Sequence, residues 1–394
     1  MNEYFEQAKA LKNIIVENRR TIHRFAEIGF ELPRTLKFVE SKLTEYGLSP
    51  QPMGKAGIVC TIGKAGKTVL LRADMDALPM KEATGLPFAA QNGNCHSCGH
   101  DSHTAMLLGA AKLLKEHESE LEGTVKLMFQ PAEEILAGAK DMIDAGLLEN
   151  PKVDAAVGLH VAAGTAFSES GTLYYAKGTA MYSGDAITIT VQGRNAHGST
   201  PEKGVDAINI AAHIVIALQE IISREVSIND QAVVLVGKIS GGDTVNTLAG
   251  HAVLEVSVRA ATEEMRAWLK ARVKEIAQSV ARTFRGEVQV EYVYGIGPLY
   301  NDPDLSEYLA DSCAQAIGID RVVQVPVTTG SEDFTYVAQQ VPSVMFYLGS
   351  GSPEQGYCNS MHHPAFLINE DVLPLGCAVY AHCAVSFLRR CIKR

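Results

Sequence analysis

Five short clusters combine residue types that bind metal ions or transfer protons: residues 72–76, 95–103, 130–134, 158–160 and 361–364. Thiolate, imidazole and carboxylate groups together suit a transition-metal site, and a carboxylate beside such a site can act as a general base. Taken singly, each cluster has an ordinary interpretation as a turn, a helix cap or a solvated loop. Together they predict a metal centre, because protein interiors bury this many ionisable groups only when the groups are paired or bind metal.

Cys95 and Cys98 form a Cys-x-x-Cys pair, which is typical of zinc half-sites and of redox proteins. A haem attachment site is excluded because Gly99, and not histidine, follows Cys98. A structural zinc site would need a second cysteine pair, which the sequence lacks, and no thioredoxin-like pattern surrounds this one. A redox protein remains an alternative, and it predicts activity without divalent metal.

Most clusters follow segments whose hydrophobic pattern predicts strands. We expect strands over residues 68–71, 125–129, 153–159 and 343–348, and helices over residues 4–18, 35–46, 104–115, 138–145, 305–317 and 371–390. This alternation predicts an α/β catalytic domain whose central sheet is flanked by helices. Because ligands of open α/β sheets bind at the carboxyl ends of the strands, we expect the clusters to meet in one cleft.

The pattern between residues 184 and 296 differs from the rest. Strands over 185–191, 232–239, 252–259 and 288–293 and helices over 205–223 and 262–284 follow the order strand-helix-strand-strand-helix-strand. That order is typical of a ferredoxin-like α+β domain. We therefore expect a catalytic domain made of residues 1–183 and 297–394, interrupted by an inserted domain of residues 184–296.

Composition limits the class of protein. The chain has 394 residues, of which 46% are hydrophobic and 20% charged, as in a globular protein of two domains. A net charge of −10 disfavours a nucleic-acid partner. No segment approaches the roughly 20 apolar residues of a membrane span, and the N-terminus lacks a signal-peptide pattern. We expect a cytoplasmic protein without a membrane partner, and its eight cysteines to be free thiols.

The motifs resemble those of a known family. They are LRADMDALP at 71–79, CGHD at 98–101, QPAEE at 130–134, GLH at 158–160 and GSEDF at 330–334. In this order they are similar to the aminoacylase and hippurate hydrolase family of dinuclear metallo-amidohydrolases, which includes N-acyl-amino-acid amidohydrolases and auxin-amino-acid-conjugate hydrolases. The resemblance spans nearly the whole chain. It implies a catalytic domain interrupted by a dimerisation or lid domain.

The resemblance also implies roles for individual residues. It implies two divalent metal ions held by Cys98, His100, Glu134, His160 and His362. Thiolate and imidazole ligands favour zinc, and manganese, cobalt and nickel are the alternatives. Glu133 would be the general base, its side chain pointing the opposite way from that of Glu134 along an extended segment. Asp76 would support the centre without binding metal. His363 is the alternative to His362, Asp74 stands where related peptidases carry a histidine ligand, and His103 is expected to be structural.

In the inserted domain, His197 resembles the family histidine that reaches the active site of the other subunit and binds the oxyanion. Asn246 and Arg259 resemble residues that hold the substrate carboxylate, although Ser257-Val258 replaces the usual Gly-Thr before the arginine. Near the N-terminus the family commonly has proline before a glutamate, where this chain has Ala26-Glu27. We expect that region, residues 23–27, to be distant from the metal and to affect only packing.

The expected function is metal-dependent hydrolysis of the amide bond of N-acyl-L-amino acids, which releases a carboxylic acid and a free amino acid. The alternative on the same scaffold is a dipeptidase or carboxypeptidase. A metal-binding module without catalysis is a third hypothesis, and it would have no need of Glu133. The expected partners are a small-molecule N-acyl amino acid and a second copy of the chain, as a homodimer or a higher homo-oligomer.

Overall fold

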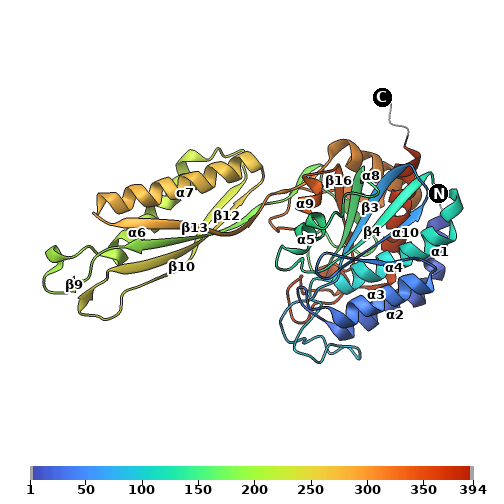
Figure 1. The fold of residues 1–394 in the computed structure, drawn as a ribbon, viewed down its shortest axis with the longest axis horizontal. Coiled ribbons are helices and arrows are strands. Elements are labelled where there is room, and N and C mark those ends of the chain that lie inside the picture. The colour runs from blue at the N-terminus through green and yellow to red at the C-terminus, as the bar shows by residue number, and fades with distance from the viewer. Residues whose placement is uncertain (1–2, 391–394) are drawn as a thin grey trace. The chain divides into compact units, whose positions relative to one another are not determined.

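The computed structural model describes residues 3–390. Two compact units divide the chain, and each is contiguous in space but not in sequence (Figure 1). The larger unit contains the described residues up to Ala180, Tyr300–Pro326 and those from Asp333 onward, and the smaller contains Met181–Leu299 and Val327–Glu332. The sequence pattern had placed the boundaries after residues 183 and 296, and it had not indicated that residues 327–332 return to the smaller unit.

An eight-stranded mixed sheet forms the centre of the larger unit. Its order is β1 (Gln51–Met53), β2 (Gly57–Gly63), β4 (Gly123–Gln130), β3 (Lys67–Asp74), β5 (Ala155–Ala162), β16 (Ser343–Gly349), β6 (Leu173–Tyr175) and β15 (Val322–Gln324). β4, β3, β5 and β16 are parallel, whereas β2 and β6 run antiparallel to their neighbours β4 and β16. The four parallel strands are buried almost throughout, as expected for a sheet covered on both faces.

Helices cover this sheet on both sides. α4 (His100–Glu116) and α10 (Leu373–Arg389) pack together over β3, and Figure 1 shows α5 (Gly138–Asp144) and α9 (Thr335–Ala338) on the opposite side. The outer helices are α1 (Glu3–Ala10), α2 (Lys12–Phe25), α3 (Pro33–Glu45) and α8 (Pro303–Ile317). The single helix expected over residues 4–18 is wrong: the chain breaks at Leu11 because α1 packs on α10 while α2 packs on α4.

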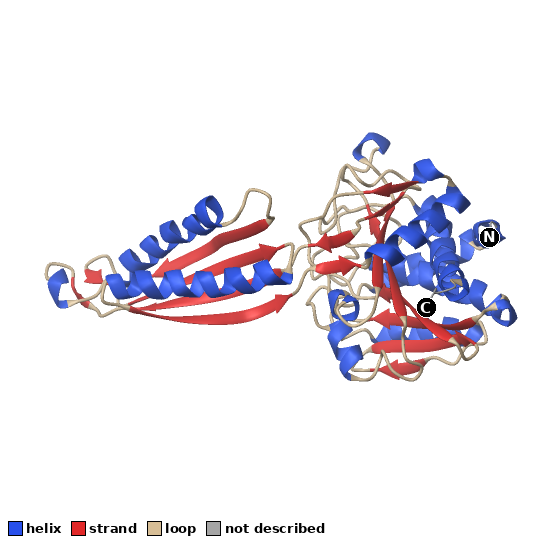
Figure 2. Ribbon diagram, turned by 90° about the horizontal axis from the view of Figure 1, so that it is seen from above, coloured by secondary structure: helices blue, strands red, loops and turns tan. Residues whose placement is uncertain are grey.

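The smaller unit is an antiparallel sheet with two helices on one face (Figure 2). The sheet order is β10 (Ala232–Gly241), β12 (His251–Ala260), β8 (Gly184–Gln192) and β13 (Glu287–Ile296). The helices are α6 (Ala207–Glu220), which continues as a π-helical turn over Ile221–Glu225, and α7 (Glu263–Thr283). This strand order is the ferredoxin-like one, and the predicted fold class is confirmed.

Short elements complete the fold. Two pairs of strands form two-stranded sheets: β7 (Gly178–Met181) with β14 (Leu299–Asn301), and β9 (Ala196–His197) with β11 (Thr247–Leu248). The 3-10 turns are Glu118–Glu120, Pro201–Lys203, Ile319–Arg321, Pro353–Gln355 and Glu370–Val372. The sequence pattern had missed these short strands and also β2.

Two helical segments, Ala207–Glu225 and Glu370–Arg389, are long and apolar enough to cross a membrane by length and composition. The sequence pattern had not singled out these two segments. In Glu370–Arg389, 89% of the apolar window is buried inside the structure, where α10 forms part of the hydrophobic core. Ala207–Glu225 packs Ile210, Ile214 and Leu218 against the smaller sheet.

Candidate metal centre and active site

The five predicted metal ligands lie close together at one edge of the larger sheet. Ligand atoms of Cys98, His100 and Glu134 all lie within 4.8 Å of one another. Cys98 Sγ is 3.5 Å from His160 Nε2, and Glu134 Oε2 is 3.4 Å from His362 Nε2. Residues from the loop after β3, the first turn of α4, the loop after β4, strand β5 and a loop near the C-terminus thus converge. His160 lies within β5 rather than after it, since the strand continues to Ala162.

Several polar atoms in this cluster are buried without a hydrogen-bond partner in the described chain. They are both ring nitrogens of His100 and Oε1 of Glu134. Leaving a buried polar group without a partner costs about 1–3 kcal/mol. A cation would relieve that cost, and a set of thiolate, imidazole and carboxylate donors suits zinc and related transition metals. The residues present therefore fit a bound divalent metal.

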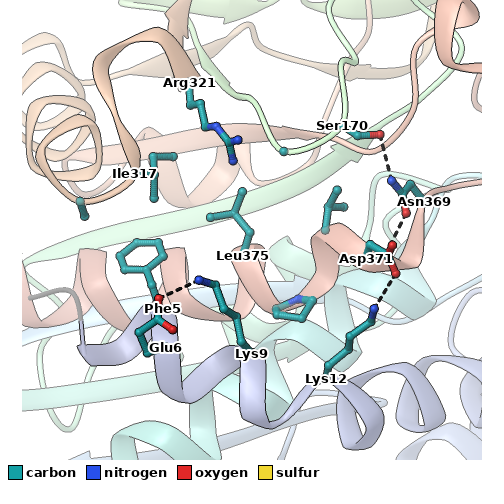
Figure 3. A pocket seen from close by; sticks show the side chains of 14 residues that line it. Phe5, Glu6, Lys9, Lys12, Ser170, Ile317, Arg321, Asn369, Asp371 and Leu375 are labelled. Atoms are coloured by element: carbon teal, nitrogen blue, oxygen red, sulfur yellow. Dashed lines mark hydrogen bonds and ion pairs between the residues drawn. The ribbon is translucent and has the colours of Figure 1, made fainter.

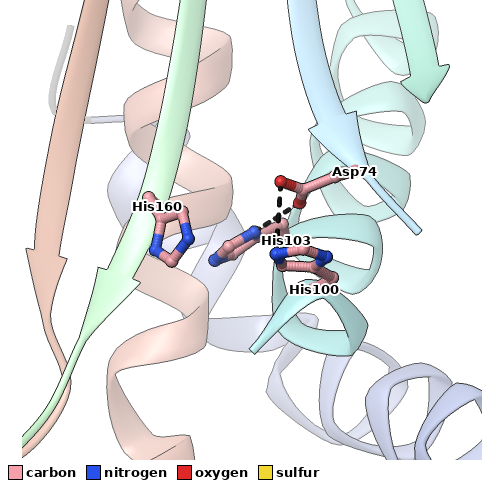
Figure 4. A group of neighbouring side chains, drawn as sticks. All are labelled: Asp74, His100, His103 and His160. Atoms are coloured by element: carbon pink, nitrogen blue, oxygen red, sulfur yellow. Dashed lines mark hydrogen bonds and ion pairs between the residues drawn. The ribbon is translucent and has the colours of Figure 1, made fainter. Parts of the chain in front are cut away.

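His103 lies beside this cluster but its ring nitrogens are already engaged (Figure 4). Nδ1 is 2.6 Å from Asp74 Oδ1, and Nε2 accepts a hydrogen bond of 2.8 Å from the Val161 amide. Asp74 in turn forms an ion pair of 2.8 Å with the buried Arg72. Because neither nitrogen of His103 has a lone pair left for a metal, the geometry favours a structural role for this histidine.

Gly99 shapes the turn between Cys98 and His100. It adopts a left-handed conformation with φ of 88° at the start of α4. A Cβ atom at this position would lie 2.4 Å from Cγ2 of Val161. Only glycine meets both conditions, so the tight turn that brings the thiol and the imidazole into one cluster depends on it.

Glu133 and Glu134 lie in a turn, so the extended segment expected for them is wrong. Asp76 accepts hydrogen bonds from both backbone amides, at 3.1 Å to Oδ1 and 3.2 Å to Oδ2. Ala132 and Leu136, on either side, have positive φ values of 55° and 54°. Asp76 Oδ1 also lies 3.4 Å from His100 Nδ1, so one buried carboxylate orients three residues of the cluster.

His362, rather than His363, faces the cluster. Its backbone has a φ of 64°, and its amide donates a hydrogen bond of 2.8 Å to the Ser97 carbonyl. By contrast, His363 Nδ1 accepts a local hydrogen bond of 3.1 Å from the Ala365 amide. The side chain of His362 is 54% exposed, whereas those of Glu134 and His100 are 9% and 0% exposed.

Protons occupy the cluster when no metal is bound. Hydrogen bonds to Cys98 and Glu134 raise the pKa of His362 to about 10, and burial raises the pKa of the Cys98 thiol. Metal binding requires a neutral imidazole and a thiolate, so it must release these protons. Burial also raises the pKa of Cys95 to about 12, and its Sγ lies 3.9 Å from the Pro364 carbonyl. A poorly ionised Cys95 gives the redox alternative little support.

In the smaller unit, the structure brings His197 and Asn246 together. His197 pairs with Thr247 in the β9–β11 ladder, and the Gly198 amide donates a hydrogen bond of 2.9 Å to the Asn246 carbonyl. His197 is exposed, with Nδ1 2.7 Å from the Ser199 hydroxyl. Their neighbouring positions are set by backbone pairing that the sequence pattern had not indicated.

Arg259 is not brought to these two residues within the chain. It lies near the end of β12, whose beginning at His251 follows β11, so roughly 26 Å of strand separates Arg259 from that beginning. Its guanidinium donates hydrogen bonds of 2.9 Å to the Thr329 carbonyl and 3.2 Å to the Ser331 hydroxyl. Thr329 and Ser331 were not predicted as partners of Arg259, although Ser331 belongs to the GSEDF motif.

Asp333, in the same motif, was also missed. It accepts a hydrogen bond of 2.5 Å from the Gln130 side chain and one of 2.9 Å from the Ala139 amide. Arg72 Nε donates to Gln130 Oε1 at 2.8 Å, which links the motif to the end of β3. These contacts hold both ends of the loop that carries Glu133 and Glu134. The sequence could have indicated them, because Arg72, Gln130 and Asp333 all belong to the motifs shared with the family.

A cavity of about 600 Å³ lies between α1, α10 and the segment around Arg321 (Figure 3). Ion pairs of 2.7 Å join Lys9 to Glu6 and Lys12 to Asp371 in its wall. None of the predicted ligands lines it. Its charges are largely paired with one another, so it offers no chemistry comparable with that of the cluster.

Three similarities to known proteins bear on this site. N-acetyl-L-cysteine deacetylase of Bacillus subtilis is 35% identical over 371 residues, which cover 92% of this chain and 85% of the relative. IAA-amino acid hydrolase ILR1-like 2 of Arabidopsis thaliana is 35% identical over 392 residues, which cover 98% and 88%. The crystal structure of the Bacillus subtilis YXEP protein, described as a dinuclear metal binding peptidase from the M20 family, superimposes with a TM-score of 0.84 at 29% identity and covers 96% of this chain and 99% of that one.

The family model described as Peptidase family M20/M25/M40 matches residues 70–386, a range that includes all five predicted ligands. The predicted resemblance to dinuclear metallo-amidohydrolases is confirmed by this match and by the named relatives. On these grounds the chain is a member of peptidase family M20/M25/M40.

Proposed function

We propose that the protein hydrolyses the amide bond of N-acyl-L-amino acids and releases a carboxylic acid and a free amino acid. Family membership and the amidohydrolase relatives make metal-dependent amide hydrolysis the reaction class. The observation that carries the proposal is the place of Glu133. Its carboxylate, 4.0 Å from His100 Nε2, lies beside a cluster of buried metal-binding atoms that lack partners.

Two divalent metal ions per subunit belong to the proposal, with Cys98, His100, Glu134, His160 and His362 as their protein ligands. When bound, such ions would polarise the amide carbonyl and lower the pKa of a water molecule toward about 7. A mixture of sulfur, nitrogen and oxygen donors is compatible with zinc, manganese, cobalt or nickel.

Glu133 is the general base in this reaction. It takes a proton from the attacking water and delivers it to the leaving amine. Its backbone amide is held by Asp76, so its position depends on the same carboxylate that positions Glu134. Because Glu133 is 7% exposed, little bulk water competes for the proton it carries.

His197, Asn246 and Arg259 would bind the substrate, with His197 on the oxyanion and the other two on the carboxylate. Arginine suits a planar carboxylate through paired hydrogen bonds. Since Arg259 and Asn246 lie toward opposite ends of β12, one substrate can meet both only if they come from different subunits. The protein is therefore proposed to work as a homodimer, either by itself or as part of a higher homo-oligomer. Its proposed location is the cytoplasm.

The smaller unit has a surface suited to such a dimer. Exposed apolar side chains gather on α6 and on the edge strand β10: Ile208, Ile216, Val233, Leu235 and Ile239. An edge strand with unpaired backbone groups can pair with a second copy, and apolar side chains beside it add buried area. Both features support an interface through the inserted unit.

The test of the reaction is a hydrolysis panel on protein reconstituted with each metal. N-acetyl, N-benzoyl and longer N-acyl amino acids are compared with unblocked dipeptides and with C-terminally extended peptides. We expect turnover of N-acyl amino acids that a chelator abolishes and added metal restores. Preferred turnover of dipeptides or peptides would establish the alternative dipeptidase or carboxypeptidase, and turnover unaffected by chelation would overturn the proposal.

The role of Glu133 is tested with Glu133→Gln. The variant keeps the shape of the side chain but cannot accept the proton, so we expect kcat to fall by roughly 100- to 10,000-fold with metal binding retained. Glu116→Gln, at the far end of α4, is the matched control and should leave kcat unchanged. A Glu133→Gln variant with wild-type turnover would exclude Glu133 as the base.

The shared substrate site is tested by mixing subunits. Asn246→Ala and Arg259→Ala are each expected to be nearly inactive, and dissociating and reassociating the mixture should restore about a quarter of wild-type activity, because half of the dimers are mixed and each mixed dimer has one intact site. No recovery in mixtures that demonstrably exchange subunits would contradict the proposal that both residues serve one site.

A further inference from the structure

A network of buried charges joins α2 to the first turn of α4. Arg19 Nε donates to Asp101 Oδ2 at 2.9 Å, and His23 Nδ1 lies 2.8 Å from the same oxygen. His23 Nε2 lies 3.0 Å from Glu82 Oε1. Arg19, His23, Asp101 and the Glu82 side chain are all buried. Asp101 directly follows His100, so His23 contacts a residue next to a predicted ligand. Whether residues 23–27 affect only packing, as expected from the sequence, stays untested.

The two partners of His23 define its protonation. A neutral imidazole has one N–H donor, yet each ring nitrogen of His23 faces a carboxylate oxygen that can only accept. Both contacts are satisfied together only by the imidazolium. Although burial opposes the charge, the hydrogen bonds that His23 donates to Asp101 and Glu82 raise its pKa. His23 is therefore a buried cation that bridges two carboxylates.

The contact between His23 and Glu82 fastens the long loop between β3 and α4 to α2. Glu82 lies within this loop, where it also accepts a hydrogen bond of 2.7 Å from the Ala90 amide. Phe88, from the same loop, packs edge-on against His23, with ring centroids 5.3 Å apart, and under the guanidinium of Arg20 at 5.0 Å. The loop ends at Cys98, and α4 begins at His100. His23 thus contacts the loop before Cys98 and the helix after it.

We propose that His23 is a positioning residue of the metal centre: its imidazolium ties Glu82 of the loop to Asp101 of α4 and so holds Cys98 and His100 at the spacing that a metal requires. This inference rests on the metal-dependent reaction proposed above. It assigns His23 no contact with metal or substrate. Its effect is on how tightly the metal is held, because groups that orient ligands typically change metal affinity by about 10- to 100-fold.

Two variants separate the two contacts of His23. His23→Asn can place an amide N–H near the former Nδ1 and keep the bond to Asp101, while the bond to Glu82 is lost. In His23→Gln the longer side chain can still reach Glu82, and this conservative variant is expected to keep much of the wild-type metal affinity. His117→Gln is the control, since His117 also bridges two side chains, Glu120 and Gln7, at 2.8 Å each, but lies at the other end of α4.

The readouts are metal affinity by chelator competition, the visible absorption spectrum of the cobalt-loaded protein, and hydrogen exchange of residues 77–98 without metal. For His23→Asn we expect roughly 10- to 100-fold weaker metal binding, an altered cobalt spectrum and faster exchange in the loop, with kcat recovering at saturating metal. His23→Gln should lie between His23→Asn and wild type, and His117→Gln should match wild type.

Wild-type metal affinity and loop exchange in a folded His23→Asn protein would overturn the inference. If His23→Asn does not fold, Glu82→Gln provides the test. Its one amide oxygen can still accept from the Ala90 amide, while an NH2 group replaces the oxygen that faces His23 and accepts from the Thr84 hydroxyl. It should weaken metal binding in the same direction, and unchanged affinity would again overturn the inference. Failure of the wild-type protein to bind divalent metal would instead overturn the proposed function, so the two failures are distinguishable.

Discussion

Asp76→Asn is the substitution for which the structure gives the clearest expectation. The carboxylate accepts one hydrogen bond from each of the Glu133 and Glu134 amides, at 3.1 and 3.2 Å. Asparagine retains one oxygen and replaces the other with an NH2 group, which cannot accept. One of the two amides therefore loses its partner inside a buried loop, and the loop must shift to relieve the contact between two donors.

The size of the effect follows from that lost partner. Leaving one buried donor unsatisfied costs about 1–3 kcal/mol, which corresponds to about a 5- to 150-fold change in an equilibrium constant. Because the affected loop carries both the proposed base and a proposed ligand, we expect metal affinity and kcat to fall together. If Asp76 supported only the fold, its substitution would lower the free energy of unfolding and leave metal affinity and kcat unchanged.

Three measurements check this expectation: metal affinity by chelator competition, kcat at saturating metal, and urea unfolding. Asp154→Asn is the matched control, because Asp154 also accepts a backbone hydrogen bond, of 2.7 Å from the Thr68 amide, at the opposite end of β3. That variant should lower only stability. If Asp76→Asn lowered stability alone, with metal affinity and kcat within about threefold of wild type, the assigned role of Asp76 would be refuted.

Two further expectations concern stability. Gly99→Ala should destabilise the metal-free protein by about 1–3 kcal/mol more than Gly85→Ala. Both glycines have positive φ, but only at Gly99 would the added methyl group meet an atom, Val161 Cγ2, at 2.4 Å. Equal thermal unfolding midpoints of the two variants would contradict this. Burial lowers the pKa of His382, so below about pH 6.5 the unfolded chain binds a proton that the folded chain does not, and unfolding free energy should fall by about 1.4 kcal/mol per pH unit until the folded pKa is reached. Urea titrations from pH 7.5 to 5 should show a steeper loss for wild type than for His382→Gln, and parallel curves would refute the assignment.

The larger features were accessible from the sequence because they follow from periodicity. Strands such as β3 and β5 are short apolar runs, and the ferredoxin-like unit alternates polar and apolar residues along β8. The metal cluster was accessible for a different reason: cysteine, histidine and glutamate at strand ends have few purely structural uses in combination. The choice of His362 over His363 needed coordinates, since a left-handed residue reverses the side-chain direction expected from neighbours.

Other features depend on contacts between distant segments, which periodicity does not encode. The network of His23, Glu82 and Asp101 joins residues 59 and 78 positions apart. The turn at Glu133 and Glu134 exists because Asp76, on another loop, binds both amides. The distance between Asn246 and Arg259 is set by the length of β12, whereas the motifs give only their order along the chain.

The half-exposed His362 differs from the other members of the cluster, whose side chains are at most 9% exposed. Its amide donates a hydrogen bond to the Ser97 carbonyl, and the nearby Pro364 carbonyl accepts one from the Ala83 amide, so its loop is tied to the segment that carries Cys98. An incoming ion would meet the thiol, imidazole and carboxylate groups already assembled, and the imidazole of His362 would complete the ligand set from the solvent side. Loading and loss of the ion would then take place on the side of the site where His362 meets solvent.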